Sequence, residues 1–316
     1  MIIPGGNYAR VRIWDPRGRS RCMKKTQETG QWTTVIKPKN NLFEVNLKEI
    51  WQYRDLISLF IKRNIITQYK QTILGPVWFV VQPALTVIMY MIVFGGIAGI
   101  PTDGVPRPLF YLAGTCMWQY FADCLTKTSN TFVSNANIFG KVYFPRLAVP
   151  ISNVISGLVR FGIQVSFFVI VYVLYAIFDP TCAASLNWYA CLAPVLVFML
   201  AGLGLGFGII ISSMTTKYRD LQVLFSFVIS LWMYATPIVY PLSKTSSMMW
   251  NGIPVHTLMC LNPVTPIIET FKYGFLDCGA FVGWRWLIYS FVWMIVLLTV
   301  GVVVFNRVQK NFMDTV

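Results

Sequence analysis

Six long apolar stretches are the feature that most constrains this chain of 316 residues. They cover approximately residues 76–100, 108–126, 150–177, 190–214, 221–242 and 286–306. Each stretch holds roughly the 20 mostly uncharged residues that a helix needs to cross about 30 Å of hydrocarbon. The sequence therefore predicts an all-α polytopic membrane protein with six transmembrane helices.

The basic residues are distributed unevenly between the two sides of these spans. Of the 26 lysines and arginines, 21 precede the first span, follow the last span, or lie in the loops after the second and fourth spans. Loops rich in Lys and Arg stay on the cytoplasmic side, so both termini are predicted to be cytoplasmic. Attraction to anionic lipid on that side accounts for the net charge of +14, and no nucleic acid partner is expected.

The motifs of common catalytic sites are missing from the sequence. The one Gly-Lys pair, Gly140-Lys141, lacks both the earlier glycine and the following Ser or Thr of a phosphate-binding loop. The sole histidine, His256, belongs to no hydrolase motif. The seven cysteines form no CxxC pair, although a disulfide between Cys260 and Cys278 on the outer side stays open. We expect no enzyme activity, no catalytic or metal site and no cofactor bound by this chain.

The chain divides into three regions by composition. Residues 1–42 mix Gly, Pro and basic residues without periodicity, which predicts a cytoplasmic extension. Residues 43–75 predict an amphipathic interfacial helix, and residues 76–316 form the transmembrane domain. This helix either anchors the chain to the membrane surface or takes part in gating, and amphipathicity does not separate the two. Its apolar positions are Leu47, Ile50, Trp51, Leu56, Phe60, Ile65 and Ile66.

Two charged residues lie unusually deep within the predicted spans. Asp123 belongs to a polar part of the second span, which we expect to face protein or a cavity rather than lipid. Arg160 lies in the third span, close enough to the cytoplasmic side for its side chain to snorkel to the interface. Snorkelling is the expected arrangement, and pairing of Arg160 with Asp123 across helices is the alternative.

Glycines and prolines indicate the packing of the later spans. The fourth span contains Gly202, Gly204, Gly206 and Gly208, which give two overlapping GxxxG spacings and predict close packing of helices. The segment between the fifth and sixth spans is too apolar for a simple loop. We expect it to form short re-entrant helices, because irregular backbone at membrane depth must be shielded by protein.

The loop between the second and third spans also predicts a short helix. Ser134 or Asn135 is suited to cap its start, and Pro145 is suited to end it. Such a helix under the membrane either connects two spans or docks into a soluble partner.

Several strings, taken together and in order, resemble the permease subunit of ABC-type polysaccharide exporters. They are LGPVWFVVQPALTVIMYMIVFG from Leu74, KVYFPRLAVP from Lys141, KYRDL from Lys217, SLWMYATPIVYP from Ser230, LNPVTPIIETFKYG from Leu261 and NFMD from Asn311. The resemblance covers approximately residues 43–316. It implies a channel formed by two copies, two copies of a separate ATPase that uses ATP and Mg²⁺, and export of a lipid-linked glycan such as O-antigen, capsule or teichoic acid. It also implies a location in the bacterial inner (plasma) membrane.

The same resemblance implies roles for particular residues. It implies a cytoplasmic substrate gate at Arg63, Lys70, Gly75 and Pro76, where the two cations would contact a pyrophosphate-linked lipid. Asn64 and Gly140 depart from the residues that the family usually has at their positions. Residues implied in coupling to the ATPase are Asn137, Ile138, Phe139, Lys141, Tyr143, Arg146, Tyr218, Arg219 and Asp220.

Sugar rings pack their CH faces on aromatic side chains, which suggests aromatic residues as the lining of a glycan channel. Trp and Tyr also gather at lipid interfaces, so an interfacial or packing role is the alternative for each. Two other functions remain open: an exporter of the same architecture for a drug or a lipid without a glycan, and a membrane-embedded lipid-linked sugar transferase. The candidate lining residues are Trp78, Phe79, Trp118, Gln119, Tyr120 and Phe121.

Overall fold

The computed structural model describes residues 47–70, 73, 75–139, 144–178, 185–215, 218, 220–246 and 248–315. The predicted extension 1–42 lies outside these residues, as do Leu74, Lys141, Tyr143 and Arg219. The helices are α1 (Leu47–Gln52), α2 (Arg54–Tyr69), η1 (Gly75–Val77), α3 (Trp78–Tyr90), η2 (Met91–Ile97), α4 (Arg107–Ser129), α5 (Thr131–Phe139), α6 (Ala148–Phe178), η3 (Trp188–Leu192), α7 (Ala193–Thr215), α8 (Leu221–Tyr234), η4 (Leu242–Thr245), α9 (Val255–Leu261), α10 (Thr265–Leu276) and α11 (Trp284–Thr315). A small hairpin pairs β1 (Met249–Trp250) with β2 (Ile253–Pro254).

The structure is that of a helical membrane protein. Four helical segments are long and apolar enough to cross a membrane, namely Gly75–Ile97, Ala148–Phe178, Trp188–Thr215 and Trp284–Val308. The apolar helix α8 is shorter, with 14 residues. Helix α4 has 23 residues but a more polar composition than the four. The predicted helical class is confirmed apart from the small hairpin, and the number of six spans stays a prediction.

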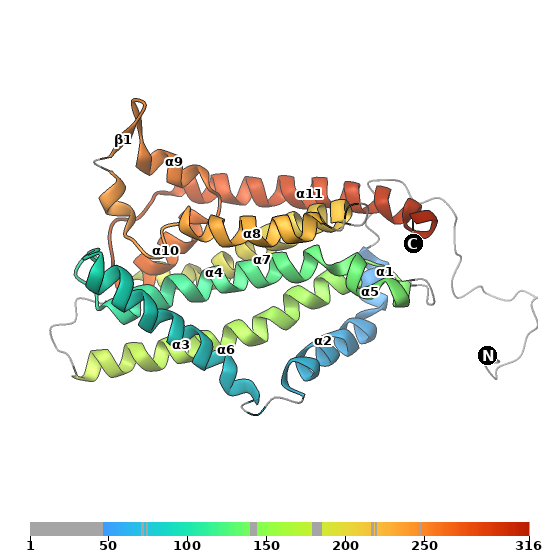
Figure 1. Cartoon of the computed structure of the whole chain (residues 1–316), viewed down its shortest axis with the longest axis horizontal. Helices are drawn as coiled ribbons and strands as arrows, with labels where there is room; N and C mark the ends of the chain where they lie inside the picture. The colour runs from blue at the N-terminus through green and yellow to red at the C-terminus, as the bar shows by residue number, and fades with distance from the viewer. Residues whose placement is uncertain are drawn as a thin grey trace, which may run out of the picture. The chain divides into compact units, whose positions relative to one another are not determined.

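Helix α4 forms the centre of the bundle (Figure 1). It packs against α3, α6, α7 and α10, and α7 in turn packs against α11. Tyr111, Met117 and Leu125 of α4 are completely buried. The polar groups of α4 are therefore shielded by protein on most sides, which explains how this helix tolerates Thr, Gln, Asp and Trp within a largely apolar bundle.

The predicted close packing at the glycines is confirmed, and it occurs on two faces of α7. A methyl group on Gly204 or Gly208 would approach Cβ of Cys124 or Thr128 in α4 to 2.7 or 2.5 Å. On the opposite face, Gly202 and Gly206 are in similarly close contact with α11. Helix α7 thus packs closely between α4 and α11, because its glycines let both neighbours approach the backbone.

The predicted interfacial helix is divided into α1 and α2 at Tyr53. One face of α2 packs on α6, where Ile57 and Phe60 are buried and the Phe60 ring lies 5.6 Å from that of Phe144. Its other side exposes apolar residues such as Leu59, which is 60% exposed. This arrangement is that expected of a helix packed on protein with one side left for lipid.

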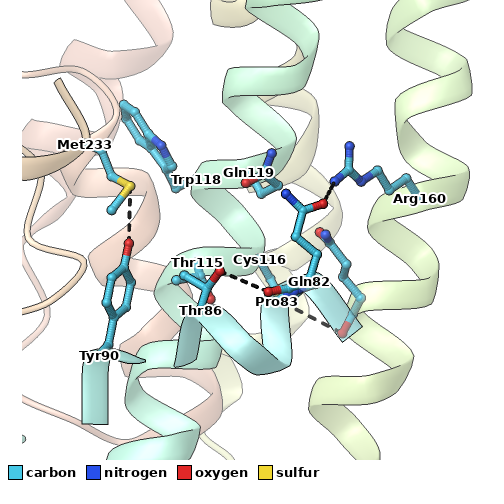
Figure 2. Close-up of a pocket in the computed structure, with 11 residues that line it drawn as sticks. Gln82, Pro83, Thr86, Tyr90, Thr115, Cys116, Trp118, Gln119, Arg160 and Met233 are labelled. Atoms are coloured by element: carbon cyan, nitrogen blue, oxygen red, sulfur yellow. Dashed lines mark hydrogen bonds between the residues drawn. The ribbon is translucent and has the colours of Figure 1, made fainter. Parts of the chain in front are cut away.

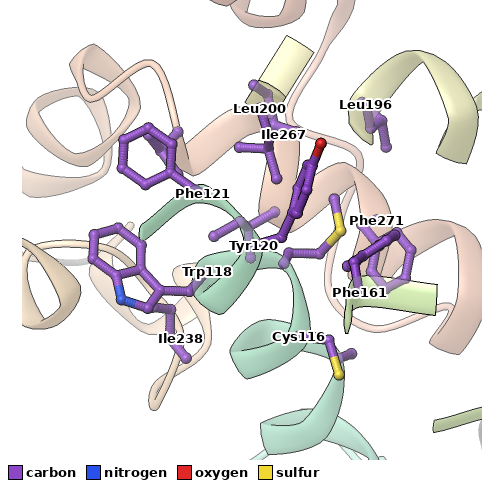
Figure 3. Close-up of a cluster of buried hydrophobic side chains, with 14 of the residues drawn as sticks. Cys116, Trp118, Tyr120, Phe121, Phe161, Leu196, Leu200, Ile238, Ile267 and Phe271 are labelled. Carbon is purple, nitrogen blue, oxygen red and sulfur yellow. The ribbon is translucent and has the colours of Figure 1, made fainter. Parts of the chain in front are cut away.

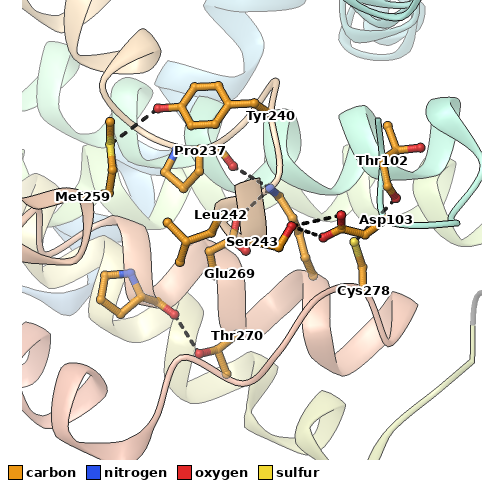
Figure 4. A network of polar contacts seen from close by, with 12 residues as sticks. Thr102, Asp103, Pro237, Tyr240, Leu242, Ser243, Met259, Glu269, Thr270 and Cys278 are labelled. Atoms are coloured by element: carbon orange, nitrogen blue, oxygen red, sulfur yellow. Dashed lines mark hydrogen bonds and ion pairs between the residues drawn. The ribbon is translucent and has the colours of Figure 1, made fainter. Parts of the chain in front are cut away.

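The segment between α8 and α11 folds as the hairpin and two short helices, α9 and α10. Helix α10 contains a buried ion pair, in which Nζ of Lys272 lies 2.8 Å from Oε1 of Glu269. Glu269 is labelled in Figure 4. Lys272 also donates a hydrogen bond to the carbonyl oxygen of Pro237 and lies over the ring of Phe110 in α4. The two short helices agree with the expected irregular segment, and their depth in a membrane stays a prediction.

The cysteines of this segment are free thiols. Sγ of Cys260 lies near His256, whereas the Cys278 thiol donates to the carbonyl oxygen of Thr102. The disulfide left open by the sequence is therefore not formed. Burial raises the pKa of both thiols to about 12, which keeps them protonated and poorly reactive near neutral pH.

Candidate functional site

A polar pocket lies between α3 on one side and α4, α6 and α8 on the other (Figure 2). It holds about 40 Å³, which is room for about three water-sized groups. Polar side chains from α3, α4 and α6 converge on it, together with aromatic and sulfur-containing residues. The lining residues are Gln82, Pro83, Thr86, Tyr90, Thr115, Cys116, Trp118, Gln119, Arg160, Gln164 and Met233.

The two deep charges form an ion pair beside this pocket. Nη1 of Arg160 lies 2.9 Å from Oδ2 of Asp123, and Nη2 donates to Oε1 of Gln82 at 3.1 Å. Gln119 donates to the other carboxylate oxygen of Asp123 at 3.3 Å. The expectation that Arg160 snorkels was wrong. A paired and hydrogen-bonded arginine costs less to bury than a lone one, and Asp123 on the neighbouring helix is within reach.

The candidate channel residues on α4 point in different directions. Trp118 and Gln119 line the pocket, whereas Tyr120 and Phe121 are 1% and 0% exposed inside the core (Figure 3). Phe121 packs 5.3 Å from the ring of Trp232. Consecutive residues of a helix are about 100° apart, so four in a row cannot share one wall. A packing role is favoured for Tyr120 and Phe121 in this arrangement, and the lining role of the set stays a prediction.

The other two candidate lining residues lie at the start of α3. Trp78 is 45% exposed and is not part of the pocket. Phe79 packs under the guanidinium of Arg160, whose carbon lies 5.0 Å from the ring centre. Neither residue joins Tyr120 or Phe121 in a common surface.

The candidate gate residues lie at the junction of α2 and α3. Arg63 is half-buried, with its guanidinium over the Phe60 ring and within 3.4 Å of Oδ1 of Asn135 in α5. Lys70 is exposed at the end of α2. Gly75 has a φ of +51°, a conformation that favours glycine, and Pro76 follows in the first turn of the next helix.

The candidate coupling residues lie on α5 and before α8. Helix α5 is kinked at Asn135, whose φ of −118° is not helical, so the predicted cap position is a break between two turns. Asn137 is exposed, Ile138 is half-buried, and Phe139 is buried against Phe132 and Phe144.

Beyond α5, the guanidinium of Arg146 lies over the ring of Phe139 at 5.5 Å. Before α8, Tyr218 is exposed, and Asp220 caps the helix by accepting a hydrogen bond from the backbone N–H of Leu221. The exposed members, Asn137, Tyr218 and Asp220, are therefore placed where a partner could contact them.

Gln82, Thr86 and Gln164 are among the polar pocket residues that were not predicted from the sequence. They lie in apolar spans, and a polar side chain in such a span is itself a signal of a protein-facing position. Which polar residues would converge could not be read from sequence, because that depends on how α3 and α6 pack against α4.

The fold is that of a multi-pass helical membrane protein. Among the residues that the structure describes, no group of three or more His, Cys, Asp or Glu side chains is placed to hold a metal ion. The chain belongs to the ABC-2 type transporter family, which matches residues 55–276. This domain is a membrane permease domain that lacks a nucleotide-binding domain.

This chain is also similar to curated proteins, and the similarity covers most of the length of each of them. The O-antigen export system permease protein RfbA of Myxococcus xanthus is 25% identical over 232 residues, which cover 73% of this chain and 84% of the relative. RfbA of Klebsiella pneumoniae is 25% identical over 261 residues, covering 82% of this chain and 94% of the relative. The resemblance to permeases of ABC-type polysaccharide exporters is thereby confirmed.

Proposed function

We propose that this chain is the channel-forming permease of an ATP-driven exporter that moves a lipid-linked polysaccharide, such as O-antigen, from the cytoplasm across the inner membrane. The observation that carries the proposal is the similarity to O-antigen export permeases, which covers 82% of this chain and 94% of the Klebsiella relative. The family membership and the helical membrane architecture support the same function.

The proposal includes partner chains that supply the ATPase activity. Family permeases pair with ATPase subunits, and we propose two copies of this chain with two copies of a separate ATPase that uses ATP and Mg²⁺. Both termini would face the cytoplasm, as the distribution of basic residues favours. Helix α5 and the turn at Tyr218 would then contact the ATPase.

Deletion of the gene in its source organism tests the proposed function. We expect loss of the surface glycan and accumulation of lipid-linked glycan inside the cell, with both defects reversed by the wild-type gene together with its ATPase partner. Gel analysis of surface glycan and of extracted lipid-linked glycan measures this outcome. An unchanged surface glycan, together with a new sensitivity to a drug, would instead favour an exporter without a glycan substrate.

The gate hypothesis predicts that removing the charges of Arg63 and Lys70 reduces glycan export more than removing the charge of a neighbouring cation. Replacing both by Ala should abolish most glycan export, because the anionic head of the carrier lipid would lose two charge-assisted hydrogen bonds. Surface glycan and assembly of the permease with its ATPase are measured in the same cells. Ordinary attraction to anionic lipid is worth about 1 kcal/mol per basic residue and does not depend on which residue is removed.

Lys62 supplies the matched control, since it is exposed on the same helix. Lys62→Ala should leave export near the wild-type level. Because Arg63 also contacts Asn135, the thermal stability of each variant is measured alongside export. A double variant with normal surface glycan, or a Lys62→Ala variant with an equal loss, would show that the gate hypothesis is wrong.

A further inference from the structure

The pocket between α3, α4, α6 and α8 contains buried hydrogen-bonding groups without partners. Gln164 is 2% exposed, and its amide nitrogen donates no hydrogen bond within the part of the chain that the structure describes. Nε of Arg160, one helical turn earlier on α6, is likewise without an acceptor. Buried donors are normally paired, so unpaired donors at a pocket indicate a ligand or ordered water.

The charge of the pocket indicates what kind of ligand fits. Arg160 is the only cation among the eleven lining residues, all of which the structure describes, and its guanidinium is already paired with Asp123 at 2.9 Å. An anion in this pocket would be close to that carboxylate and would compete with it for the arginine. A neutral ligand avoids this repulsion.

The remaining lining groups suit hydroxyl groups. Gln82, Gln119 and Gln164 carry amides, each of which both donates and accepts hydrogen bonds, as a hydroxyl does. Trp118 and Tyr90 provide flat apolar surfaces at the same pocket (Figure 2). Amides beside aromatic rings match the alternation of hydroxyls and CH faces on a sugar.

The volume limits how much of a sugar can enter. About 40 Å³ accommodates a hydroxyl or hydroxymethyl arm but not a whole ring. Gln82 at the edge of the pocket is exposed, so a longer ligand lying along α3 can insert such an arm from that side.

From this geometry we infer that the pocket is a sugar subsite, in which the side-chain amide of Gln164 forms a hydrogen bond with a hydroxyl of a neutral sugar unit. The inference rests on the proposed function and deepens it. It assigns a neutral sugar unit to the pocket on the α3 side of the bundle, whereas the anionic head group of the carrier lipid is expected at Arg63 and Lys70. The exposed amide of Gln82 would contact the same sugar at the edge.

A thiol-protection experiment tests this inference with defined probes. The full chain, assembled with its ATPase in liposomes, carries Thr86→Cys as its only cysteine. Thr86 lines the pocket, and its hydroxyl is used only within its own helix, where it donates to the carbonyl oxygen of Gln82. Labelling of the new thiol by a small maleimide is measured with octyl glucoside or octylphosphocholine, each below its critical micelle concentration.

We expect octyl glucoside to slow labelling by about threefold at about twice its dissociation constant, because an occupied site is shielded. Octylphosphocholine, which has the same tail and a zwitterionic head without sugar hydroxyls, should protect much less. Gln164→Leu should abolish the protection by the glucoside. Ser166→Ala should retain it, because Ser166 is exposed on the same helix and is not among the lining residues.

Three results would overturn the inference: equal protection by both amphiphiles, protection by neither, or undiminished protection in the Gln164→Leu variant. The comparison of the two amphiphiles needs no substitution at Gln164, so it holds even if that variant folds poorly. Failure here is separable from failure of the proposed function, which is measured independently as loss of surface glycan on gene deletion.

Discussion

Gly208→Leu is expected to destabilise the folded permease strongly and to lower its yield. A Cβ atom at Gly208 would lie 2.5 Å from Cβ of Thr128 and 3.0 Å from the backbone oxygen of Leu125, so the side chain must force α7 away from α4. Overpacking of this kind costs about 3 kcal/mol or more where backbone has to move, which is about a hundredfold in the folding equilibrium. The yield of monodisperse protein in size-exclusion chromatography measures the effect.

Gly162→Leu is the matched control for this prediction. Gly162 is also a helical glycine within an apolar span, but it is exposed on α6, and a Cβ there meets no atom within 4 Å. We expect this variant to be recovered in near wild-type yield. Equal losses in the two variants would mean that leucine is harmful for a reason other than contact between α7 and α4.

Lys272→Met is expected to have the second large effect. Lys272 is 0% exposed, and its removal leaves the carboxylate of Glu269 buried without a counter-ion. Breaking a buried pair on one side costs about 3–5 kcal/mol. Thermal unfolding of the purified protein should show a large loss of stability, whereas Lys244→Met, which removes an exposed lysine, should change little.

The pH dependence of the Lys272→Met variant provides an independent test. Burial raises the pKa of the Glu269 carboxyl, and loss of the lysine raises it further. A carboxyl whose pKa is higher in the folded than in the unfolded protein favours folding as pH falls, because the folded state then binds the extra proton. The stability defect should therefore shrink between about pH 8 and about pH 5. In Lys272→Met/Glu269→Gln the defect should be smaller and should not change with pH. A defect independent of pH in the single variant would contradict this account.

The sequence predicted features that depend on one segment at a time. The long apolar helices and the small-residue face of α7 follow from composition and spacing within a helix. The Glu269–Lys272 pair was not predicted from the sequence. The spacing of three residues between the two is the sign that could have shown it.

Features that depend on two segments could not be predicted. The partner of Arg160 was misjudged because the distance between α4 and α6 cannot be read from either span. For the same reason, Tyr120 and Phe121 were grouped with Trp118, although Tyr120 packs against Phe161 of α6 and Phe121 packs against Trp232 of α8. Aromatic composition indicates a protein-facing or interfacial position, and only the packing decides which.

The Asp123–Arg160 pair also has an electrical consequence. A single charge carried across the full membrane potential involves about 2.3 kcal/mol of work per 100 mV. The carboxylate and the guanidinium, 2.9 Å apart, sum to zero charge, so α4 and α6 can shift together without moving net charge through the field at this point. The membrane potential would therefore do no net work on such a shift at this pair.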